Sequence, residues 1–279
     1  MMRRLKWRLG RKLYCDARGE QTSGDMQRNG EAFLQRCVLA NAPTGASLVA
    51  FDIGANQGEW TRALLAAAPE ALRTPDRLKI HAFEPVPSTA DMFTEAVSSQ
   101  AGADCVTLNR FALSDENGET EIAVYDDGAG TNSLHFSRDP RRPQRTETVP
   151  LKTLDQYCAE AQVEHVHLVK CDAEGHDAHV ISGAQESLKA SRIDVMQFEY
   201  NYRWVLSRTF LRDVFEMIDA TPYTLGRVDP SSVTLFDTWH FELDRFFQSN
   251  YALIHERALD WTPTVRGRFD ASNVFATDR

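Results

Sequence analysis

Short, almost entirely apolar segments alternate with amphipathic, helix-like segments along most of the chain, and this alternation constrains the fold more than any other feature. The strand-like segments span residues 47–52, 78–84, 104–109, 165–172, 193–199, 222–228 and 250–256. Strands that are apolar along their whole length are typical of a parallel sheet with helices on both faces. The sequence therefore predicts an α/β fold with a mostly parallel sheet of seven strands.

Two further segments interrupt this alternation. Residues 119–126 and 146–154 read as additional strands or sheet edges, and they are connected by a long polar loop, DGAGTNSLHFSRDPRRPQRT. This loop carries Arg138, Arg141, Arg142 and Arg145. Loops of this length in a folded domain are often functional. The arginines either close over an acidic acceptor or form a solvent-exposed charged loop, and the sequence leaves both interpretations open.

Charge is spread unevenly along the chain. The net charge of −9 over 279 residues argues against an extended nucleic-acid-binding surface. Residues 1–20 nevertheless contain seven Lys or Arg and two acidic residues, so this segment carries +5. We expect residues 1–44 to form an N-terminal helical appendage and residues 45–279 to form the main domain.

The basic N-terminal segment also has apolar residues at helical spacing. Leu5, Leu9 and Leu13 recur every four residues, with Trp7 and Tyr14 beside them. Such a helix can lie on an anionic membrane surface. It can equally dock on the acidic body of the protein or on a partner subunit, so peripheral membrane contact is one of three open interpretations.

Cysteine usage and the lack of long apolar runs favour a cytoplasmic setting. The five cysteines are scattered and none belongs to a C-x-x-C pair, as expected of reduced thiols. The segment MMRRLKWRLGRKLY has charges throughout, unlike a secretory signal. No run approaches the ~20 apolar residues that a membrane-spanning helix needs. We expect a cytoplasmic protein that can associate with a membrane through its basic N-terminus.

The stretch FDIGANQGEW, residues 51–60, places Asp52, Gly54, Asn56 and Gly58 where the first strand gives way to a helix. Ligands of α/β sheets bind at the carboxyl ends of parallel strands. Glycines let a ligand approach main-chain N–H groups, and a helix start offers unpaired donors. This turn is therefore predicted to bind one end of a ligand.

Glu84 closes the second strand at the same edge of the sheet. A carboxylate there can accept both hydroxyls of a ribose and would repel a 2′-phosphate, which indicates a nucleoside with an unmodified ribose. The end of the third strand would meet the adenine edge through main-chain groups of Ala112 and Leu113, together with Asp115.

Two nucleoside cofactors compete for this site. A dinucleotide site favours G-x-G-x-x-G, whereas this turn reads D-x-G-x-N-x-G with an acid before the first glycine. Asp52 would meet a cationic amino group, which favours the methionine end of S-adenosylmethionine, unless it only caps the turn. An NAD-type oxidoreductase and a non-catalytic nucleotide-binding scaffold remain the alternative functions.

A second charged cluster follows the strand at 165–172, in the stretch LVKCDAEGHDAHVISGA. Charges at strand ends are costly unless they serve a site. Asp172 is the first candidate for a general base and also borders the cofactor, with Glu199 or His176 next. Lys170 would hold the acceptor or keep Asp172 ionised. The alternative is a structural Lys170–Asp172 pair, with Glu174 or Asp177 at a helix N-terminus.

Seven blocks of the sequence together resemble the FkbM-type methyltransferases. They are FDIGANQGEWT, HAFEPVPST, ALSDENGETEIAVYD, GTNSL, VPLKTLDQY, KCDAEGHDAHVISGA and QFEYN, in that order within residues 47–201. The resemblance implies a class I, Rossmann-like, S-adenosylmethionine-dependent fold and methyl transfer to a hydroxyl of a sugar, glycan or natural product. The chain departs from the family pattern at Asp177, where Glu is usual, and at Cys171, where a branched apolar residue is usual.

Carboxylates and histidines raise the question of a metal. Asp172, Glu174 and Glu199 could assemble a divalent-cation site that lowers the pKa of the acceptor. The resemblance does not suggest one. His165, His167, His176 and His179 also lack convincing ligand spacing, so we predict that the reaction needs no metal.

Overall fold

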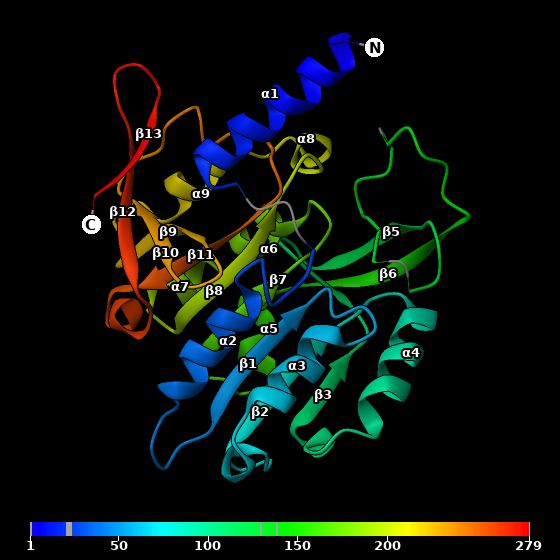
Figure 1. The fold of residues 1–279 in the computed structure, drawn as a ribbon. Helices are drawn as coiled ribbons and strands as arrows, with labels where there is room; N and C mark the ends of the chain where they lie inside the picture. Colours follow the sequence, from blue (N-terminus) through cyan, green and yellow to red (C-terminus); the bar gives the residue numbers. More distant parts are fainter. Residues whose placement is uncertain (1, 21–23, 129, 138, 279) are drawn as a thin grey trace.

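The computed structural model describes residues 2–20, 24–128, 130–137 and 139–278, and these form a central sheet of ten strands (Figure 1). In spatial order the strands are β13 (Phe275–Asp278), β12 (Thr264–Phe269), β10 (Val233–Phe236), β9 (Tyr223–Val228), β11 (Ser249–His255), β8 (Ile193–Tyr200), β7 (Val166–Cys171), β1 (Leu48–Ile53), β2 (Leu78–Phe83) and β3 (Val106–Asn109). Seven of them are the predicted strands. The predicted α/β class is therefore confirmed, and β10, β12 and β13 extend the sheet beyond the prediction.

Five neighbouring strands, β3, β2, β1, β7 and β8, are parallel. The chain runs from β1 outward to β3 and later returns to β7 on the other side of β1. Strand order thus reverses between β1 and β7. In open α/β sheets this reversal leaves a crevice at the carboxyl ends of the strands, where ligands bind.

Helices cover both faces of the sheet. One face carries α2 (Glu31–Ala40), α3 (Glu59–Ala67) and α4 (Pro87–Ser98); the other carries α5 (Leu154–Glu160), α6 (Asp177–Ser182), α7 (Gln185–Lys189), α8 (Trp204–Ser207) and α9 (Leu211–Met217). Leu48 and Ala50 of β1 belong to the first core, whereas Val49, Phe51 and Ile53 belong to the second. Successive strand residues point to opposite faces, so a strand buried on both sides must be apolar along nearly its whole length.

The other half of the sheet mixes strand directions. β11 is antiparallel to both of its neighbours, β8 and β9, and β10 is antiparallel to β9. β12 runs parallel to β10 and pairs with the edge strand β13. Residues of β12 are alternately exposed and half-buried, which is typical of a strand near a sheet edge.

A second, three-stranded sheet lies beside the main one. Its order is β4 (Ala112–Ser114), β6 (Arg145–Thr153) and β5 (Gly118–Val124), so both predicted additional strands are present. The chain leaving β5 folds back on it, because the N–H of Ala123 donates to the carbonyl of Ser133 at 3.0 Å. This return brings the first part of the long loop to the edge of the main sheet.

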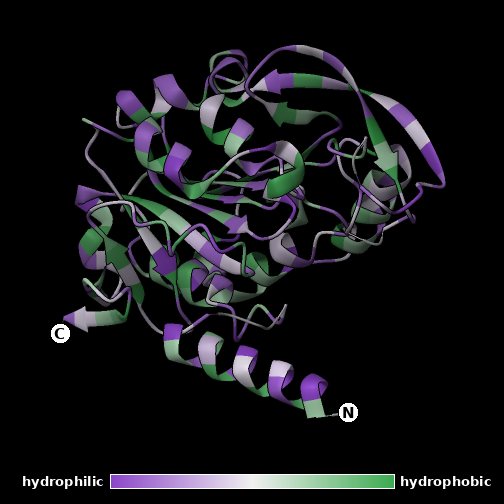
Figure 2. Ribbon diagram, turned by 90° about the horizontal axis from the view of Figure 1, so that it is seen from above, coloured by the Kyte–Doolittle hydropathy of each residue, from purple (hydrophilic) through white to green (hydrophobic). Residues whose placement is uncertain are grey.

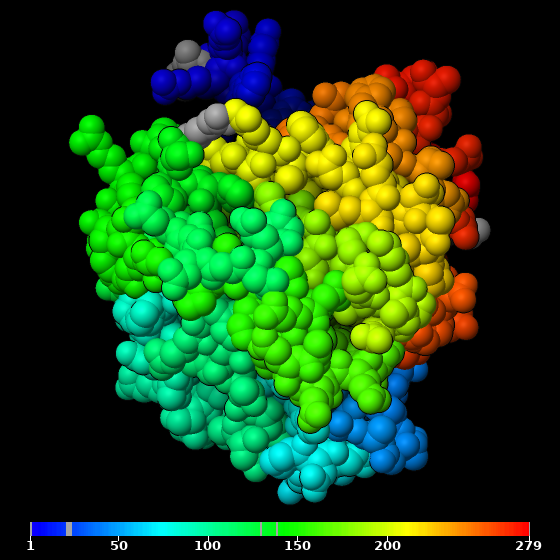
Figure 3. All heavy atoms as spheres, turned by 180° about the vertical axis from the view of Figure 1, so that it is seen from behind, coloured from blue at the N-terminus to red at the C-terminus, as the bar shows by residue number. Residues whose placement is uncertain are grey.

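The two N-terminal helices pack differently. Leu34, Val38 and Leu39 of α2 belong to the same buried core as β1. Helix α1 (Met2–Arg18) buries only Cys15 and Arg18 and projects from the body, as Figures 2 and 3 show. None of the described helices is long and apolar enough to cross a membrane.

Candidate active site

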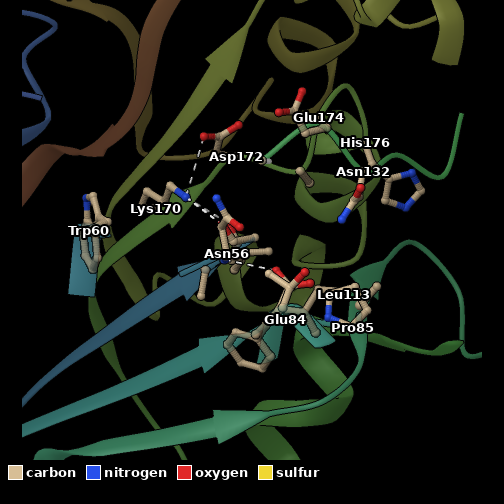
Figure 4. Close-up of a pocket in the computed structure, with 18 of the residues that line it drawn as sticks. Asn56, Trp60, Glu84, Pro85, Leu113, Asn132, Lys170, Asp172, Glu174 and His176 are labelled. Carbon is tan, nitrogen blue, oxygen red and sulfur yellow. Dashed lines mark hydrogen bonds and ion pairs between the residues drawn. The ribbon is translucent and has the colours of Figure 1, made fainter. Parts of the chain in front are cut away.

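A pocket opens at the carboxyl ends of β1, β2 and β7, where strand order reverses (Figure 4). It encloses about 1100 Å³, counting the part open to solvent, which is enough for a cofactor and part of an acceptor. Eight residues predicted from the sequence line it: Gly54, Asn56, Glu84, Ala112, Leu113, Lys170, Asp172 and His176. Four predicted residues, Asp52, Gly58, Asp115 and Glu199, do not line it.

The carboxylate of Glu84 is fixed at the pocket wall by two backbone N–H groups. Oε2 accepts from Asn56 and Oε1 accepts from Val86, each at 3.0 Å. Each carboxylate oxygen has a second lone pair, so both can still accept a hydrogen bond from a ligand. Burial raises the pKa of Glu84 to about 7, although the two N–H groups act in the opposite direction. The group is therefore oriented to bind two adjacent hydroxyls.

Both glycines of the turn after β1 have positive φ, but for different reasons. Gly54 has φ 71°, and a Cβ there would lie 2.0 Å from the carbonyl oxygen of Asp172. Only glycine lets the turns after β1 and β7 pass this closely. Gly58 has φ 76°, and a Cβ there would lie 2.9 Å from Val97. Gly58 permits the close packing of α3 on α4 and does not line the pocket, so its role in cofactor binding stays a prediction.

Asp52 also differs from its prediction. Its side chain is fully buried; Oδ2 accepts from the Thr61 hydroxyl at 2.7 Å and Oδ1 lies 3.4 Å from Nζ of Lys170. The charge that we expected to meet a ligand amino group is met by Lys170 instead. Asp52 therefore supports the pocket from beneath and does not line it, and its contact with the cofactor stays a prediction.

Asp172 and Glu174 share the turn after β7 (Figure 4). The Asp172 side chain is 39% exposed, and Oδ2 lies 3.8 Å from Nζ of Lys170, beyond hydrogen-bonding distance. Glu174 has φ 54° and pairs with Nε of Arg203 at 2.8 Å. Burial and the nearby Asp172 carboxylate raise the pKa of Glu174. Of these two carboxyl groups, Asp172 is the one placed to accept a proton.

Glu199 and Asp115 are committed to other partners. Glu199 accepts hydrogen bonds from Gln248 at 2.7 Å and from Asn201. Burial and neighbouring carboxylates raise the pKa of Glu199. Asp115 accepts from Nδ1 of His179 at 3.0 Å. Neither side chain lines the pocket, so the geometry does not support the base predicted at Glu199 or the cofactor contact predicted at Asp115, and both stay predictions.

His176 lines the pocket as part of a cluster of imidazoles. Nδ1 lies 2.9 Å from Nε2 of His135, and Nε2 lies 3.0 Å from the Ser114 hydroxyl. Burial lowers the pKa of His176, and it lowers the pKa of His135 to about 4. Both rings are neutral at pH 7, and both nitrogens of His176 have partners. This arrangement makes His176 a rigid wall residue and a poor general base.

Among the residues that the structure describes, two groups have ring nitrogens or carboxylate oxygens within 4.8 Å of one another and could hold a cation by distance. The first is His135, His176 and His179; the second is His165, His167 and Asp194. In the first, the rings of His176 and His179 are stacked at 4.5 Å and inclined by 11°. An ion bound by a nitrogen lone pair lies in the ring plane, and two stacked rings do not share a plane. In the second, Asp194 is already paired with Arg257 and His165. The expectation of a metal-independent reaction stays a prediction.

The first part of the long loop forms another wall of the pocket. Nε2 of Gln57 donates to the carbonyl of Gly128 at 2.7 Å, and Asn132 and Leu134 line the pocket. The arginines lie farther along. Arg141 pairs with Asp139 at 2.6 Å, and Arg145 pairs with Asp127 at 2.7 Å and with Glu147 at 2.6 Å. Arg138 lies outside the described residues.

Sequence reasoning missed several lining residues. Glu31 belongs to the segment that we expected to be an appendage, yet it lines the pocket and accepts from Asn29 at 2.6 Å. Burial raises the pKa of Glu31. Asn132 lies in a loop without regular structure, and its place in the block GTNSL was the signal that the sequence offered. Trp60 stands at the end of the stretch FDIGANQGEW, and its closeness to the glycine turn was the signal there.

The model of the Methyltransferase FkbM domain matches residues 52–223. This span begins at the glycine turn, ends in β9 and covers more than half of the chain. The chain belongs to the FkbM methyltransferase family. Among curated proteins, the 2-O-methyltransferase NoeI of Sinorhizobium fredii is 27% identical over 156 residues, which cover 52% of this chain. The matched region covers 60% of NoeI, less than two thirds of its length.

Solved structures give weaker overall likenesses. Methyltransferase FkbM of Methylobacillus flagellatus KT has a TM-score of 0.46 and 13% identity, covering 74% of this chain and 43% of that one. Precorrin-6y C5,15-methyltransferase of Geobacter metallireducens GS-15 has a TM-score of 0.39 and 13% identity, covering 80% and 88% of the two chains. Membership of the FkbM family rests on the domain match.

The pocket of this FkbM methyltransferase is strongly acidic. Its lining carboxyl groups are those of Glu31, Glu59, Glu84, Asp172 and Glu174, whereas Lys170 supplies the lining ammonium group. The Lys170 charge is already balanced by Asp52 from below. Electrostatic attraction in a partly desolvated pocket is stronger than in water. Burial raises the pKa values of Glu31, Glu84 and Glu174, so the lining carries less negative charge than its number of carboxyl groups suggests. The described lining still offers an anionic ligand no unpaired cation, because Lys170 is paired with Asp52.

Proposed function

We propose that this methyltransferase uses S-adenosylmethionine and transfers the methyl group to a hydroxyl of a sugar, glycan or natural-product acceptor. The observation that carries this proposal is the acidic pocket in which the fixed Glu84 carboxylate faces the glycine turn. S-adenosylmethionine joins a ribose with two free hydroxyls to a sulfonium and to an amino-acid end with one ammonium and one carboxylate group, so its net charge is positive. A hydroxyl-binding carboxylate among further carboxyl groups complements both parts.

The lining residues fit this cofactor part by part. Glu84 would bind the ribose hydroxyls through its two remaining lone pairs. The apolar groups of Pro85, Ala112 and Leu113 would border the adenine. The amino-acid end, which carries an ammonium and a carboxylate group, would face the turn at Gly54.

The same geometry weighs against a dinucleotide. NAD carries a pyrophosphate with two negative charges, and the Lys170 ammonium group of the lining is already paired with Asp52. Titration with S-adenosylmethionine and with NAD separates the two: binding of NAD in preference to S-adenosylmethionine would support the oxidoreductase alternative. A scaffold would bind the nucleoside without any turnover.

Acceptor chemistry would take place beside Asp172. When bound, the cofactor supplies a methyl group that is activated by its sulfonium. Asp172 would accept the proton of the acceptor hydroxyl, and Asn132 and Glu174 would hydrogen-bond neighbouring hydroxyls. Orientation of this kind contributes on the order of 7–11 kcal/mol. NoeI is named a 2-O-methyltransferase, which supports oxygen as the acceptor atom.

Screening with methyl-labelled S-adenosylmethionine tests the proposal. The full chain is incubated with pools of glycans and hydroxylated natural products, and the Asp172→Asn variant serves as the blank. We expect label in a product whose methyl group is attached through an ether oxygen. Label attached to nitrogen or carbon would contradict O-methylation.

A further inference from the structure

Helix α1 is attached to the protein body by one face near its C-terminal end. Arg18 donates to the side chain of Glu242 at 2.7 Å, and the Tyr14 hydroxyl donates to the same carboxylate at 2.7 Å. The Arg11 guanidinium lies 5.3 Å from the centre of the Phe247 ring. These contacts fix the orientation of the helix relative to the body.

The opposite face carries an exposed apolar stripe. Its side chains and exposed fractions are Met2 73%, Leu5 66%, Leu9 54% and Leu13 59%. At 3.6 residues per turn the four side chains fall within an arc of about 80°. Tyr14, Arg18 and Arg11 lie on the other side of the helix by the same geometry. The stripe therefore points away from the body, which excludes the body as its partner.

Basic residues flank this stripe. In helical projection the exposed Lys6 and Lys12 border it on either side, and the exposed Arg3 and Arg8 lie next to them. Arg4 and Arg11 are exposed on the opposite side of the helix. Lys12 pairs with Asp16 at 2.7 Å. Long basic side chains beside an apolar face can extend toward the phosphates while their stems stay in the apolar region.

We propose that α1 binds the surface of an anionic lipid bilayer, with its leucine stripe in the acyl boundary and its cations at the headgroups. A nucleic acid would meet the cations but leave the leucines in water, so the paired apolar and basic features favour a bilayer. The inference does not depend on the proposed function. Gly24 and Met26 follow α1 in the chain and line the pocket, so a short stretch of chain links the membrane helix to the site.

Vesicle flotation of the full chain tests this. We expect binding to vesicles of phosphatidylcholine and phosphatidylserine in equal amounts, weakening as salt is raised, and much weaker binding to phosphatidylcholine alone. Leu9→Glu should weaken binding roughly tenfold or more, because it removes a buried leucine from the acyl boundary. Lys6→Gln should weaken it roughly fivefold, corresponding to about 1 kcal/mol per basic residue.

Two controls match these changes elsewhere on the surface. Ala66→Glu adds the same charge at an exposed position of α3, and Lys189→Gln removes an exposed lysine from α7; both should bind vesicles like the unchanged protein. Circular dichroism confirms that each variant is folded. The proposal is overturned if the protein does not bind vesicles that contain phosphatidylserine at low salt, or if the Leu9→Glu variant binds them as strongly as the unchanged protein. A third outcome would also overturn the proposal: the unchanged protein does not bind vesicles but sediments as a dimer, and the Leu9→Glu variant sediments as a monomer. The stripe would then be the contact surface for a second copy of the chain.

Discussion

Lys170 and Asp52 face each other across the two central strands, and their ion pair lies directly beneath the glycine turn. Lys170 on β7 stands opposite Asp52 on β1 in the strand register, and Nζ of Lys170 lies 3.4 Å from Oδ1 of Asp52. The Lys170 side chain is 7% exposed and the Asp52 side chain is 0% exposed. Nζ also donates to the carbonyl of Gly54 at 3.1 Å. Although burial opposes the charged form, the carboxylates of Asp52, Asp172 and Glu31 raise the pKa of Lys170. The pair ties the floor of the pocket to the turn.

Lys170→Met should therefore destabilise the fold by about 3–5 kcal/mol, because it leaves the fully buried Asp52 carboxylate without its cation. Urea unfolding at pH 7 measures the change. Lys189→Met breaks the ion pair between Lys189 and Glu186, whose side chains are 60% and 79% exposed. This change should lower the free energy of unfolding by at most about 1 kcal/mol. The double variant Lys170→Met/Asp52→Asn should recover part of the lost free energy of unfolding, because it also removes the unpaired carboxylate. Equal losses of unfolding free energy for Lys170→Met and Lys189→Met would contradict a structural ion pair between Lys170 and Asp52.

Gly54→Ala should damage stability and cofactor binding together. The new Cβ would lie 2.0 Å from the Asp172 carbonyl oxygen, at a positive φ that alanine rarely adopts. We expect a loss of roughly 2–4 kcal/mol from strain and displaced backbone. Gly10→Ala is the matched control, since nothing lies within 4 Å of its added Cβ. A melting temperature for Gly54→Ala as high as that of Gly10→Ala would show that the two turns are not closely packed.

Asp172→Asn should lower turnover by about 10²–10⁴-fold while leaving cofactor affinity nearly intact, because it removes the proposed base. Single-turnover assays and calorimetry separate the two effects. Asp115→Asn changes a carboxylate that pairs with His179 outside the pocket and should keep full turnover. Wild-type turnover in Asp172→Asn would remove this residue from the mechanism.

Without ligand, the protein should lose stability as pH rises from about 4.5 to about 7, and the loss should level off above that range. Burial raises the pKa values of Glu84 and Asp177 to about 7, from ordinary values of 4.5 and 3.8. In this range the folded state binds protons that the unfolded state has already released, so the stability that they provide is lost on deprotonation. Urea unfolding at several pH values should show a flatter slope for Glu84→Gln; stability that rises with pH would contradict this account.

The sequence predicted strands best where burial on both faces required continuous apolar residues, as in Leu48–Ile53. It missed β12 because TVRGRF alternates exposed and half-buried side chains and carries two arginines. Antiparallel strands such as β10 need no helical crossover, so the alternation of strands and helices did not reveal them.

The site was predictable where a residue's place follows from the end of a strand, as for Glu84 and Asp172. The site was not predictable where the register between two strands decides which side chains meet. The sequence alone does not show that Asp52 on β1 stands opposite Lys170 on β7. His135 comes from a loop and Glu31 from a helix far away in sequence. Only the folded chain brings His135 against the lining residue His176 and Glu31 into the pocket lining.

Calorimetric titration of Glu84→Gln with S-adenosylmethionine tests the central claim most directly. An amide cannot replace the carboxylate between two backbone N–H donors and two ribose hydroxyls, so affinity should fall roughly tenfold or more relative to the unchanged protein. Glu95→Gln, an exposed glutamate of α4, should bind normally. A folded Glu84→Gln variant that binds S-adenosylmethionine as tightly as the unchanged protein would contradict the proposed cofactor site.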